Sequence, residues 1–381
     1  MPHPTVADVV ALLERRYPPQ LAESWDAVGL TCGDPAATVR RVLFAVDPDP
    51  VVADEAVGSG TDLLVTHHPL FLRPVHSVAA TDAKGRVVQR LLEHGCALFS
   101  AHTNADSARP GVSDALADAL GVVDAEPLQA LPGDPVDKVV VFVPHADVER
   151  VLAAMAAAGA GGIGAYEDCA YVLEGTGRFR PRAGARPHVG EVGRLETVAE
   201  QRVEMVVPRS RRWAVVDALL AAHPYEEPAY DVYERALPPS DRGLGRVGDL
   251  PQEVLLGEFA ATVATALPAT SHGVRVAGDP DRTVRRVAVC GGAGDSLMGA
   301  ADAAGADVFV TADLRHHRAQ EHLADGGCAL VDVAHWASEW PWLDRAAAAL
   351  VEDLAGSGTT VETRVSTRVT DPWSLHLRSP R

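Results

Sequence analysis

Six side chains of types that bind metal ions lie in three groups, each just after a short apolar run. They are His67 and His68 after DLLVT, His102 and Asp106 after ALFSA, and His335 and Glu339 after ALVDVA. Imidazole and carboxylate donors suit zinc, iron, manganese, cobalt and nickel, whereas Cu(I) and iron–sulfur clusters prefer thiolates. The residue types therefore predict a divalent-metal site and leave the choice among these metals open.

Two of the three groups have the spacing of one helical turn. His102 and Asp106 form H-x-x-x-D, and His335 and Glu339 form H-x-x-x-E. Side chains four residues apart lie on one face of a helix, so each pair can present a nitrogen and an oxygen to one point. A helix N-terminus also disfavours an imidazolium, which keeps histidine neutral and able to bind a metal.

The adjacent histidines His67 and His68 point in different directions and are poorly placed to chelate one ion together. Each could instead serve one of two neighbouring ions. Two metal ions about 3.5–4 Å apart are a known hydrolytic arrangement, and a carboxylate commonly bridges them. Glu339 or Asp106 would suit that bridge. A histidine pair in an ordinary loop remains the simpler interpretation of this motif when it is taken alone.

An internal repeat predicts the elements that position these groups. RRVLFAVD (40–47) and TDLLVTHH (61–68) match RRVAVCGG (285–292) and ADVFVTAD (306–313). The first Arg of one motif precedes the first Asp of the next by 22 residues in both halves, from Arg40 to Asp62 and from Arg285 to Asp307. The runs CALFSAHT and CALVDVAH follow, and helical stretches separate the runs. This alternation predicts βαβ units with parallel strands in two similar halves. Sites in open α/β sheets lie at the carboxyl ends of strands, so the three groups should converge.

The segment between the halves has a different pattern. The runs KVVVFVP (138–144) and VEMVVP (203–208) each lead into a helix, and a strand-like stretch follows each helix. The order β-α-β-β-α-β is typical of a ferredoxin-like domain. We therefore expect an α/β protein in which two similar α/β halves with parallel-strand sheets, 1–130 and 244–381, form one discontinuous domain. An inserted ferredoxin-like α+β domain would occupy 131–243.

Composition and charge limit the classes of partner. The 381 residues include 52 acidic and 34 Lys or Arg residues, which gives a formal net charge of −18. Such an excess opposes a chain-wide nucleic-acid surface and anchoring to anionic lipid. A nucleic-acid-binding ring would need a locally basic face and is the weakest alternative. No apolar run reaches the roughly 18 residues of a membrane span, and no signal peptide is evident. Five widely spaced cysteines without a CxxC motif favour free thiols in a reducing cytoplasm.

The motifs VTHHPLF, AHTNAD, VTADLRHH and AHWASE, with the early WDAVGL, closely resemble those of the NIF-three-like family. Its members are also known as dinuclear-metal-centre proteins or GTP cyclohydrolase I type 2 homologues. The resemblance covers nearly the whole chain, including an inserted PII/CutA-like domain that closes in AHPYEEPAYDVY. One departure is Ala27, where the family pattern WDNxGL commonly has Asn. That difference puts in doubt a role for the amide and leaves the metal motifs intact.

The resemblance implies two divalent metal ions per subunit, with Zn, Fe or Mn as candidates. The implied ligands are His67, His68, Asp106, His335 and Glu339, of which Glu339 is the best candidate for a bridge. His102 would lie beside the site as a ligand or proton carrier, and His317 would line it. The family also implies a cytoplasmic homohexamer with the metals facing an inner cavity.

Two functions are compatible with this implied site. One is a metal-dependent hydrolase in which a metal-activated water opens the ring of a small-molecule substrate, a nucleotide such as GTP. His102 or His317 would then move a proton. The other is a metal-storage, metal-delivery or regulatory ring without catalysis, which the inserted domain suggests by analogy of fold.

Three further features have both a functional and a structural interpretation. The glycines of CGGAGDS (290–296) suit a phosphate cradle or a tight strand-to-helix turn, and we prefer the turn. The cluster Arg209, Arg211 and Arg212 is expected to be the solvated start of a helix, with phosphate binding as the alternative. His322 has no partner pattern and is predicted to be a surface or loop residue.

Overall fold

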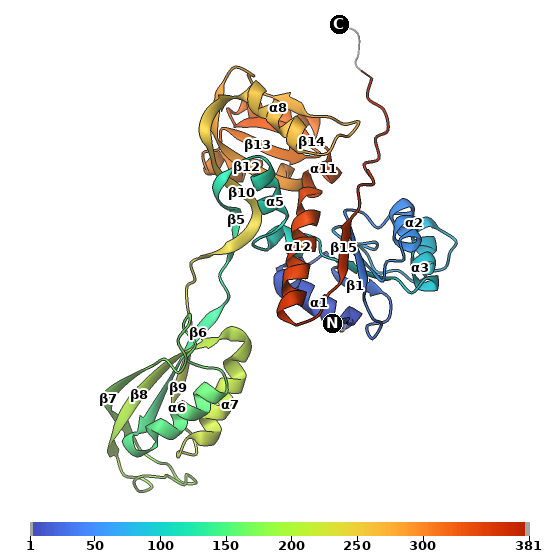
Figure 1. The fold of residues 1–381 in the computed structure, drawn as a ribbon. Helices are drawn as coiled ribbons and strands as arrows, with labels where there is room; N and C mark the ends of the chain where they lie inside the picture. Colours follow the sequence, from blue (N-terminus) through green and yellow to red (C-terminus); the bar gives the residue numbers. More distant parts are fainter. Residues whose placement is uncertain (1–2, 378–381) are drawn as a thin grey trace. The chain divides into compact units, whose positions relative to one another are not determined.

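The structure is a computed structural model that describes residues 3–377, and the chain separates into two compact units. The first unit comprises Met1–Leu131 and Asp241–Arg381, and the second is the insert Pro132–Ser240. Figure 1 shows the chain coloured from its N-terminus to its C-terminus. Within the described residues, no helix combines the length and the apolar character needed to cross a membrane.

The first sheet of the larger unit has five strands in the order β1-β4-β3-β2-β15. Their bounds are β1 (Gly29–Cys32), β4 (Ala97–Ser100), β3 (Leu63–Thr66), β2 (Arg41–Ala45) and β15 (Glu362–Val365). All pairs are parallel except β1 with β4. Helices α2 (Pro50–Gly58) and α3 (Ala83–Glu93) connect β2 to β3 and β3 to β4, and both bury apolar side chains against the sheet.

The second sheet has six strands in the order β11-β14-β13-β12-β10-β5. Their bounds are β11 (Arg275–Ala277), β14 (Ala329–Val333), β13 (Val308–Ala312), β12 (Thr283–Ala293), β10 (Pro239–Leu255) and β5 (Val123–Pro132). Strands β12, β13 and β14 are parallel, and α9 (Met298–Ala303) and α10 (His316–Ala324) connect them. The first four strands repeat the order and directions of the first sheet's first four, which confirms the predicted duplicated α/β fold.

The 22-residue offset of the repeat has a hydrogen-bonding cause. Asp62 Oδ2 accepts from the backbone N–H groups of Arg40 and Arg41 at 2.7 and 2.9 Å. Asp307 Oδ2 accepts from the matching N–H groups of Arg285 and Arg286 in β12 at 2.9 and 2.8 Å. One carboxylate at the start of the second strand thus holds the start of the first strand, which fixes the stagger between them in both halves.

The two halves of this unit exchange strands. The C-terminal β15 joins the first sheet beside β2, and β5, from the N-terminal part of the chain, joins the second sheet beside β10. A repeat indicates which segments are alike, but not which sheet a following strand will join, so the sequence did not predict this exchange. Helices α1 (Val6–Arg16), α5 (Val112–Ala119), α8 (Leu256–Ala266) and α12 (Pro341–Gly356) contribute to a core shared by both sheets.

A buried arginine also joins the halves. Arg246 on β10 is 0% exposed. Its Nε and Nη2 atoms donate to the two carboxylate oxygens of Asp114 on α5, at 2.8 and 2.7 Å. Its remaining donors reach the carbonyls of Gly243, Gly245 and Ala108, each at 2.7 Å. A guanidinium paired in this way satisfies its donors without water and fixes β10 against α5.

The insert has the predicted strand and helix order. Its elements are β6 (Val136–Pro144), α6 (Val148–Ala157), β7 (Ala170–Phe179), β8 (Glu196–Pro208), α7 (Arg212–Ala222) and β9 (Tyr230–Glu234). The strands form an antiparallel sheet in the order β7-β8-β6-β9, which is the ferredoxin-like arrangement. Both helices cover one face of it (Figure 1) and share a valine-rich core with β6 and β8.

The arginine cluster at the start of α7 is not the solvated patch that the sequence suggested. Arg212 Nε donates to Asp137 Oδ2 at 2.7 Å, and Arg209 Nη2 donates to Asp137 Oδ1 at 3.1 Å. The Asp137 side chain is fully buried, and the hydrogen bond from Arg212 leads the effects that lower its pKa. Two of the three arginines therefore neutralise a buried carboxylate of β6, a long-range partner that local sequence does not reveal.

Candidate metal centre

The carboxylate of Glu339 lies at the meeting point of three histidines. Its Oε1 atom is 3.0 Å from His335 Nε2 and 3.4 Å from His67 Nε2, and its Oε2 atom is 3.1 Å from His68 Nε2. Asp106 Oδ1 lies 3.7 Å from His67 Nε2. The five residues that the motifs proposed as ligands therefore come together in one cluster with their donor atoms facing inward.

Strand ends and two short helices bring these residues together. His67 and His68 directly follow β3, while α4 (Thr103–Ser107) follows β4 and carries Asp106. Helix α11 (His335–Glu339) follows β14 and places His335 and Glu339 four residues apart on one face. The site thus lies at carboxyl ends of parallel strands from both sheets, as the topology of an open α/β sheet requires.

The other ring nitrogen of each of these histidines is held by an acceptor. His67 Nδ1 donates to the carbonyl of Ala101 at 2.9 Å. His68 Nδ1 donates to Asp47 at 2.7 Å, and His335 Nδ1 donates to Asp313 at 2.7 Å. A carbonyl oxygen can only accept, so the proton of neutral His67 resides on Nδ1 and the Nε2 lone pair faces the cluster. Acceptors on Nδ1 orient histidine ligands in metal sites and increase their basicity.

Three buried polar atoms at the centre have no hydrogen-bond partner among the described residues. They are His67 Nε2, Asp106 Oδ1 and Glu339 Oε2. Buried polar atoms are almost always paired, and each unpaired one costs about 1–3 kcal/mol. Three such atoms directed at one space, all of metal-binding type, are the arrangement that a bound cation would satisfy. The residues present therefore fit the divalent metal that the motifs suggest.

The donors around Glu339 form overlapping groups. His67 and His335 both approach Oε1 of Glu339, His68 approaches Oε2, and Asp106 lies next to His67. Within described residues, metal-compatible groups also include His67, His68 and His102, and separately His68, His335 and Glu339. His68 thus belongs to both groups, while Glu339 contacts His67, His68 and His335 through its two carboxylate oxygens.

The buried carboxylates of the centre favour protonation of the groups around them. Burial lowers the pKa of His68, but attraction to the Glu339 carboxylate and the hydrogen bond to Asp47 outweigh burial and raise it to about 10. Attraction to Glu339 leads the effects that raise the pKa of His335 to about 11. Burial raises the pKa of Asp106. Buried carboxylates without a cation impose this demand for protons, and a divalent cation meets the same demand.

The glycines of CGGAGDS make room for the Glu339 carboxylate. A Cβ on Gly292, whose φ is +67°, would lie 2.4 Å from Glu339 Oε1 and 3.0 Å from His335 Nε2. The Gly292 N–H donates to Ser338 Oγ at 2.8 Å, and the Gly291 N–H donates to Ser113 Oγ at 3.4 Å. These backbone donors are already used, so the structure supports the tight turn over the phosphate cradle at these two glycines.

His102 lies beside the cluster, with its ring edge-on to those of His67 and His68. Its ring centroid is 5.2 Å from that of His67 and 5.4 Å from that of His68. Its Nδ1 atom donates to Asp26 at 2.8 Å, and Asp26 also accepts from the Thr103 N–H at 3.0 Å. Burial raises the pKa of Asp26, but the hydrogen bonds from His102 and Thr103 outweigh it and hold the carboxyl well below its usual range.

His317 and His322 lie on α10. His317 is exposed, and the structure records a ring contact of it with His316, with centroids 5.0 Å apart. His322 was predicted to be a surface or loop residue, and this is wrong. Its side chain is only 7% exposed, and Nε2 lies 3.0 Å from the carbonyl of Cys328. The helix turns this ring back onto the start of β14, a packing direction that a motif search does not reveal.

Sequence reasoning missed the three aspartates that orient the histidines. Asp47, at the end of the RRVLFAVD motif, and Asp26 in WDAVGL stood within quoted motifs but were given no role. Asp313 occupies the repeat position of His68, because VTAD matches VTHH. Its φ of 57° is a conformation that aspartate tolerates better than most residues. Comparison of the two repeats would have signalled Asp313 as a polar group at the same strand end.

Two similar α/β halves with a histidine and carboxylate cluster at their strand ends define the class of this protein. The model of the Duf34/NIF3 (NGG1p interacting factor 3) family matches residues 4–372, and the chain belongs to this family. A Mycobacterium leprae protein named GTP cyclohydrolase 1 type 2 homolog is 52% identical over 98% of this chain and 96% of its own length. A Bacillus subtilis protein of the same name is 41% identical, over 87% of this chain and 88% of its own.

Solved structures agree with this assignment. A Bacillus cereus protein related to NIF3 has a TM-score of 0.77 and 37% identity, over 98% of this chain and all of that one. A Staphylococcus aureus protein has a TM-score of 0.85 and 29% identity, over 98% of this chain and 99% of that one. The resemblance read from the motifs is therefore confirmed at the level of the family and of the α/β fold.

Proposed function

We propose that this protein is a metal-dependent hydrolase that holds two divalent ions at the Glu339 centre. The observation that supports the proposal most directly is the convergence of three buried, unpaired donor atoms, on His67, Asp106 and Glu339. His67 and Asp106 would hold one ion, His68 and His335 the other, and Glu339 both. Zinc, iron and manganese all suit this donor set.

The chemistry that the ions would supply is the activation of water near neutral pH and the polarisation of a substrate oxygen or nitrogen. The residues of the chain orient the metal-binding side chains. Asp47, Asp313 and the Ala101 carbonyl hold the histidine rings with Nε2 facing the centre. The surrounding β3 and β14 strand ends are buried, so the donors are held by packing and by hydrogen bonds.

We assign the proton transfer to His102. Unlike His67, His68 and His335, it makes no ion-pair contact with Glu339 in the part of the chain that the structure describes. Its Nδ1–H is fixed by Asp26, so neutral His102 can accept a proton at Nε2 while Asp26 stabilises the imidazolium. A role for His317 rests on the family resemblance alone.

The proposed substrate is a small nucleotide such as GTP, opened hydrolytically at its imidazole ring with release of formate. The names of the relatives from Mycobacterium leprae and Bacillus subtilis support this choice. The net charge of −18 favours a small-molecule substrate over nucleic acid. We further propose a cytoplasmic homohexamer; the free state of all five cysteines is consistent with a reducing compartment.

The test measures GTP loss and formate release by the full chain, stripped of metal and reloaded separately with Zn²⁺, Mn²⁺ or Fe²⁺. The wild type should consume GTP with at least one metal, and a His67→Ala/His335→Ala variant should not. His94→Ala is the matched control. His94 is exposed at the end of α3, and its ring is hydrogen bonded to the Arg90 carbonyl of the same helix. Loss of activity in both variants would argue against a specific centre.

The same experiment distinguishes the alternative function. If the wild type binds two ions per subunit but no loaded form consumes GTP, the hydrolase proposal fails for this substrate. A metal-storage, metal-delivery or regulatory role without catalysis would then account for the centre. That alternative has one observation in its favour, which is that the insert forms a separate compact unit with its own core and its own cavity.

A further inference from the structure

The insert contains a cavity of about 590 Å³ that belongs entirely to its own residues. Phe142 on β6 and Arg202 on β8 are cross-strand partners, as are Arg202 and Leu173 on β7. Cross-strand partners share one face of a sheet, and alternate residues such as Val141 and Val203 pack into the helix-covered core. The cavity therefore lies against the sheet face opposite α6 and α7. Its volume is in the range of small-molecule sites.

Two glycines open the floor of this cavity. Residues 173, 175, 177 and 179 of β7 point to the same face, and Gly175 and Gly177 leave a gap between Leu173 and Phe179. A Cβ on Gly177 would lie 1.9 Å from Glu200 Oε2, so this position must be glycine if Glu200 is to keep its place. A Cβ on Gly175 would meet the Glu200 carbonyl oxygen at an ordinary 3.8 Å. Gly175 can therefore be enlarged without a local clash.

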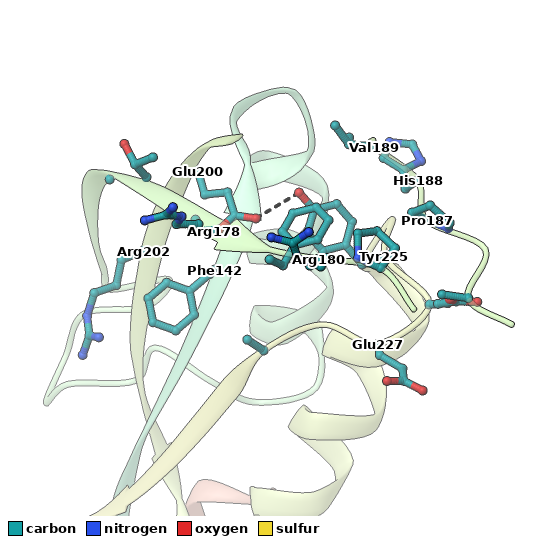
Figure 2. Close-up of a pocket in the computed structure, with 18 of the residues that line it drawn as sticks. Phe142, Arg178, Arg180, Pro187, His188, Val189, Glu200, Arg202, Tyr225 and Glu227 are labelled. Atoms are coloured by element: carbon teal, nitrogen blue, oxygen red, sulfur yellow. Dashed lines mark hydrogen bonds between the residues drawn. The ribbon is translucent and has the colours of Figure 1, made fainter. Parts of the chain in front are cut away.

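Aromatic side chains form one wall of the cavity. The Tyr225 ring centroid is 6.1 Å from that of Phe179 and 6.1 Å from that of His188. Figure 2 shows Pro187, His188 and Val189 on the loop that covers this side. Rings at these separations pack against one another and present an aromatic surface on which a planar ligand can lie, and an aromatic contact contributes about 0.5–1.5 kcal/mol per pair beyond burial.

A carboxylate without a countercharge faces the same space. Glu200 Oε1 accepts a hydrogen bond from the Tyr225 hydroxyl at 2.9 Å, which Figure 2 shows as a dashed line. Among residues 3–377, no arginine, lysine or histidine lies within ion-pair distance of Glu200. Its other oxygen, over Gly177, is therefore available to accept hydrogen bonds from a ligand.

Positive charge is available elsewhere on the lining. Arg178 and Arg180 line the cavity and are both exposed. Arg180 Nη1 donates to the Gly193 carbonyl at 2.9 Å, and neither arginine has an acidic partner in the described part of the chain. Guanidinium groups recognise phosphates and carboxylates. The lining thus combines an acceptor for N–H groups, flat apolar walls and two available cations.

We propose that this cavity binds a guanine nucleotide. The edge of guanine carries a ring N–H beside an exocyclic amino group, and a carboxylate such as Glu200 accepts from both. Adenine presents an unprotonated ring nitrogen beside its amino group, which repels a carboxylate. The Tyr225 and Phe179 rings would pack against the base, and Arg178 and Arg180 would meet the phosphate. The site is separate from the Glu339 centre, and the proposal does not depend on hydrolysis there.

The test measures binding of GMP, with AMP as the competing base, to the metal-free full chain by titration calorimetry. The wild type should bind GMP at least about tenfold more tightly than AMP, because AMP lacks one of the two hydrogen bonds to a charged acceptor. Glu200→Gln should weaken GMP binding about tenfold or more for the same reason. Gly175→Val, which fills the floor, should remove binding.

Two controls make the outcome decisive. Glu149→Gln changes an exposed carboxylate of α6, on the other face of the sheet, and should bind GMP like the wild type. Glu339→Ala alters the metal centre and should also leave GMP binding unchanged, so binding there is distinguished from binding to the insert. The proposal is overturned if GMP at about 1 mM does not bind, if AMP binds equally well, or if Glu200→Gln and Gly175→Val both bind normally.

Discussion

The aspartate that orients His335 provides a sharp test of the proposed division of the donors between two ions. Asp313 Oδ2 lies 2.7 Å from His335 Nδ1, and the hydrogen bond from this histidine leads the effects that lower the Asp313 pKa. Asp313→Asn keeps an acceptor at the same place but removes its charge. Asparagine tolerates a φ of 57° about as well as aspartate, so the backbone should not change. The substitution therefore isolates the charge of one orienting group.

The size of the effect follows from the geometry. Exchange of a charged for a neutral acceptor costs about 1 kcal/mol of hydrogen-bond energy. Substitutions of such orienting groups weaken metal binding about 10- to 100-fold. Because the Asp313 side chain is 57% exposed, solvent screening places the effect at the lower end of this range. We expect about a tenfold weaker affinity, or roughly 1.4 kcal/mol, for the ion held by His68 and His335.

The assay titrates metal-free protein with Zn²⁺ against a chromogenic chelator, so that both binding events are resolved. Asp313→Asn should weaken one event and leave the other, held by His67 and Asp106, within about twofold. Asp168→Asn is the matched control, since Asp168 on the insert has a similar φ of 53°. Equal weakening of both events, no weakening at all, or the same change in Asp168→Asn would refute the assignment of donors to two sets.

Two further predictions concern stability. Arg246→Ala should lower the free energy of unfolding by about 3–5 kcal/mol, measured by urea denaturation, because it leaves the Asp114 carboxylate without its buried partner. Burial lowers the pKa of His223, so the folded insert favours the neutral ring. The stability of the insert should be complete above the unfolded pKa of about 6.5 and fall as the pH drops below it. Hydrogen exchange of insert peptides between pH 5 and 7.5 should show this loss in the wild type, and His223→Gln should flatten it; a pH-independent wild type would contradict the reasoning.

Much of this protein could be predicted because its determinants are local or repeated. The duplicated RRV…D and VT motifs indicated two βαβ halves, since apolar strand runs and helical periodicity depend on neighbouring residues. The i, i+4 spacing of His335 and Glu339 indicated a shared helix face, and α11 provides it. The order of elements in the insert indicated its fold for the same reason.

The partners of the functional side chains could not be predicted, because they depend on contacts between distant parts of the chain. The contact of Asp26 with His102 spans 76 residues, and that of Asp137 with Arg212 spans 75. Likewise, the exchange of β5 and β15 between the sheets depends on which edge strand is free after the halves pack. Local patterns carry no information about these pairings.

The sequence by itself determined the donor types, their positions at strand ends and the family to which the chain belongs. The tertiary structure decided that Glu339 lies among three histidines, and that Asp47 and Asp313 fix the rings of His68 and His335. It also placed Glu200 over Gly177 in a cavity of the insert. The physical reason is that residue chemistry and periodicity depend only on neighbouring residues in the sequence. Burial and pairing depend on distant segments that pack against each other and remove water from between them.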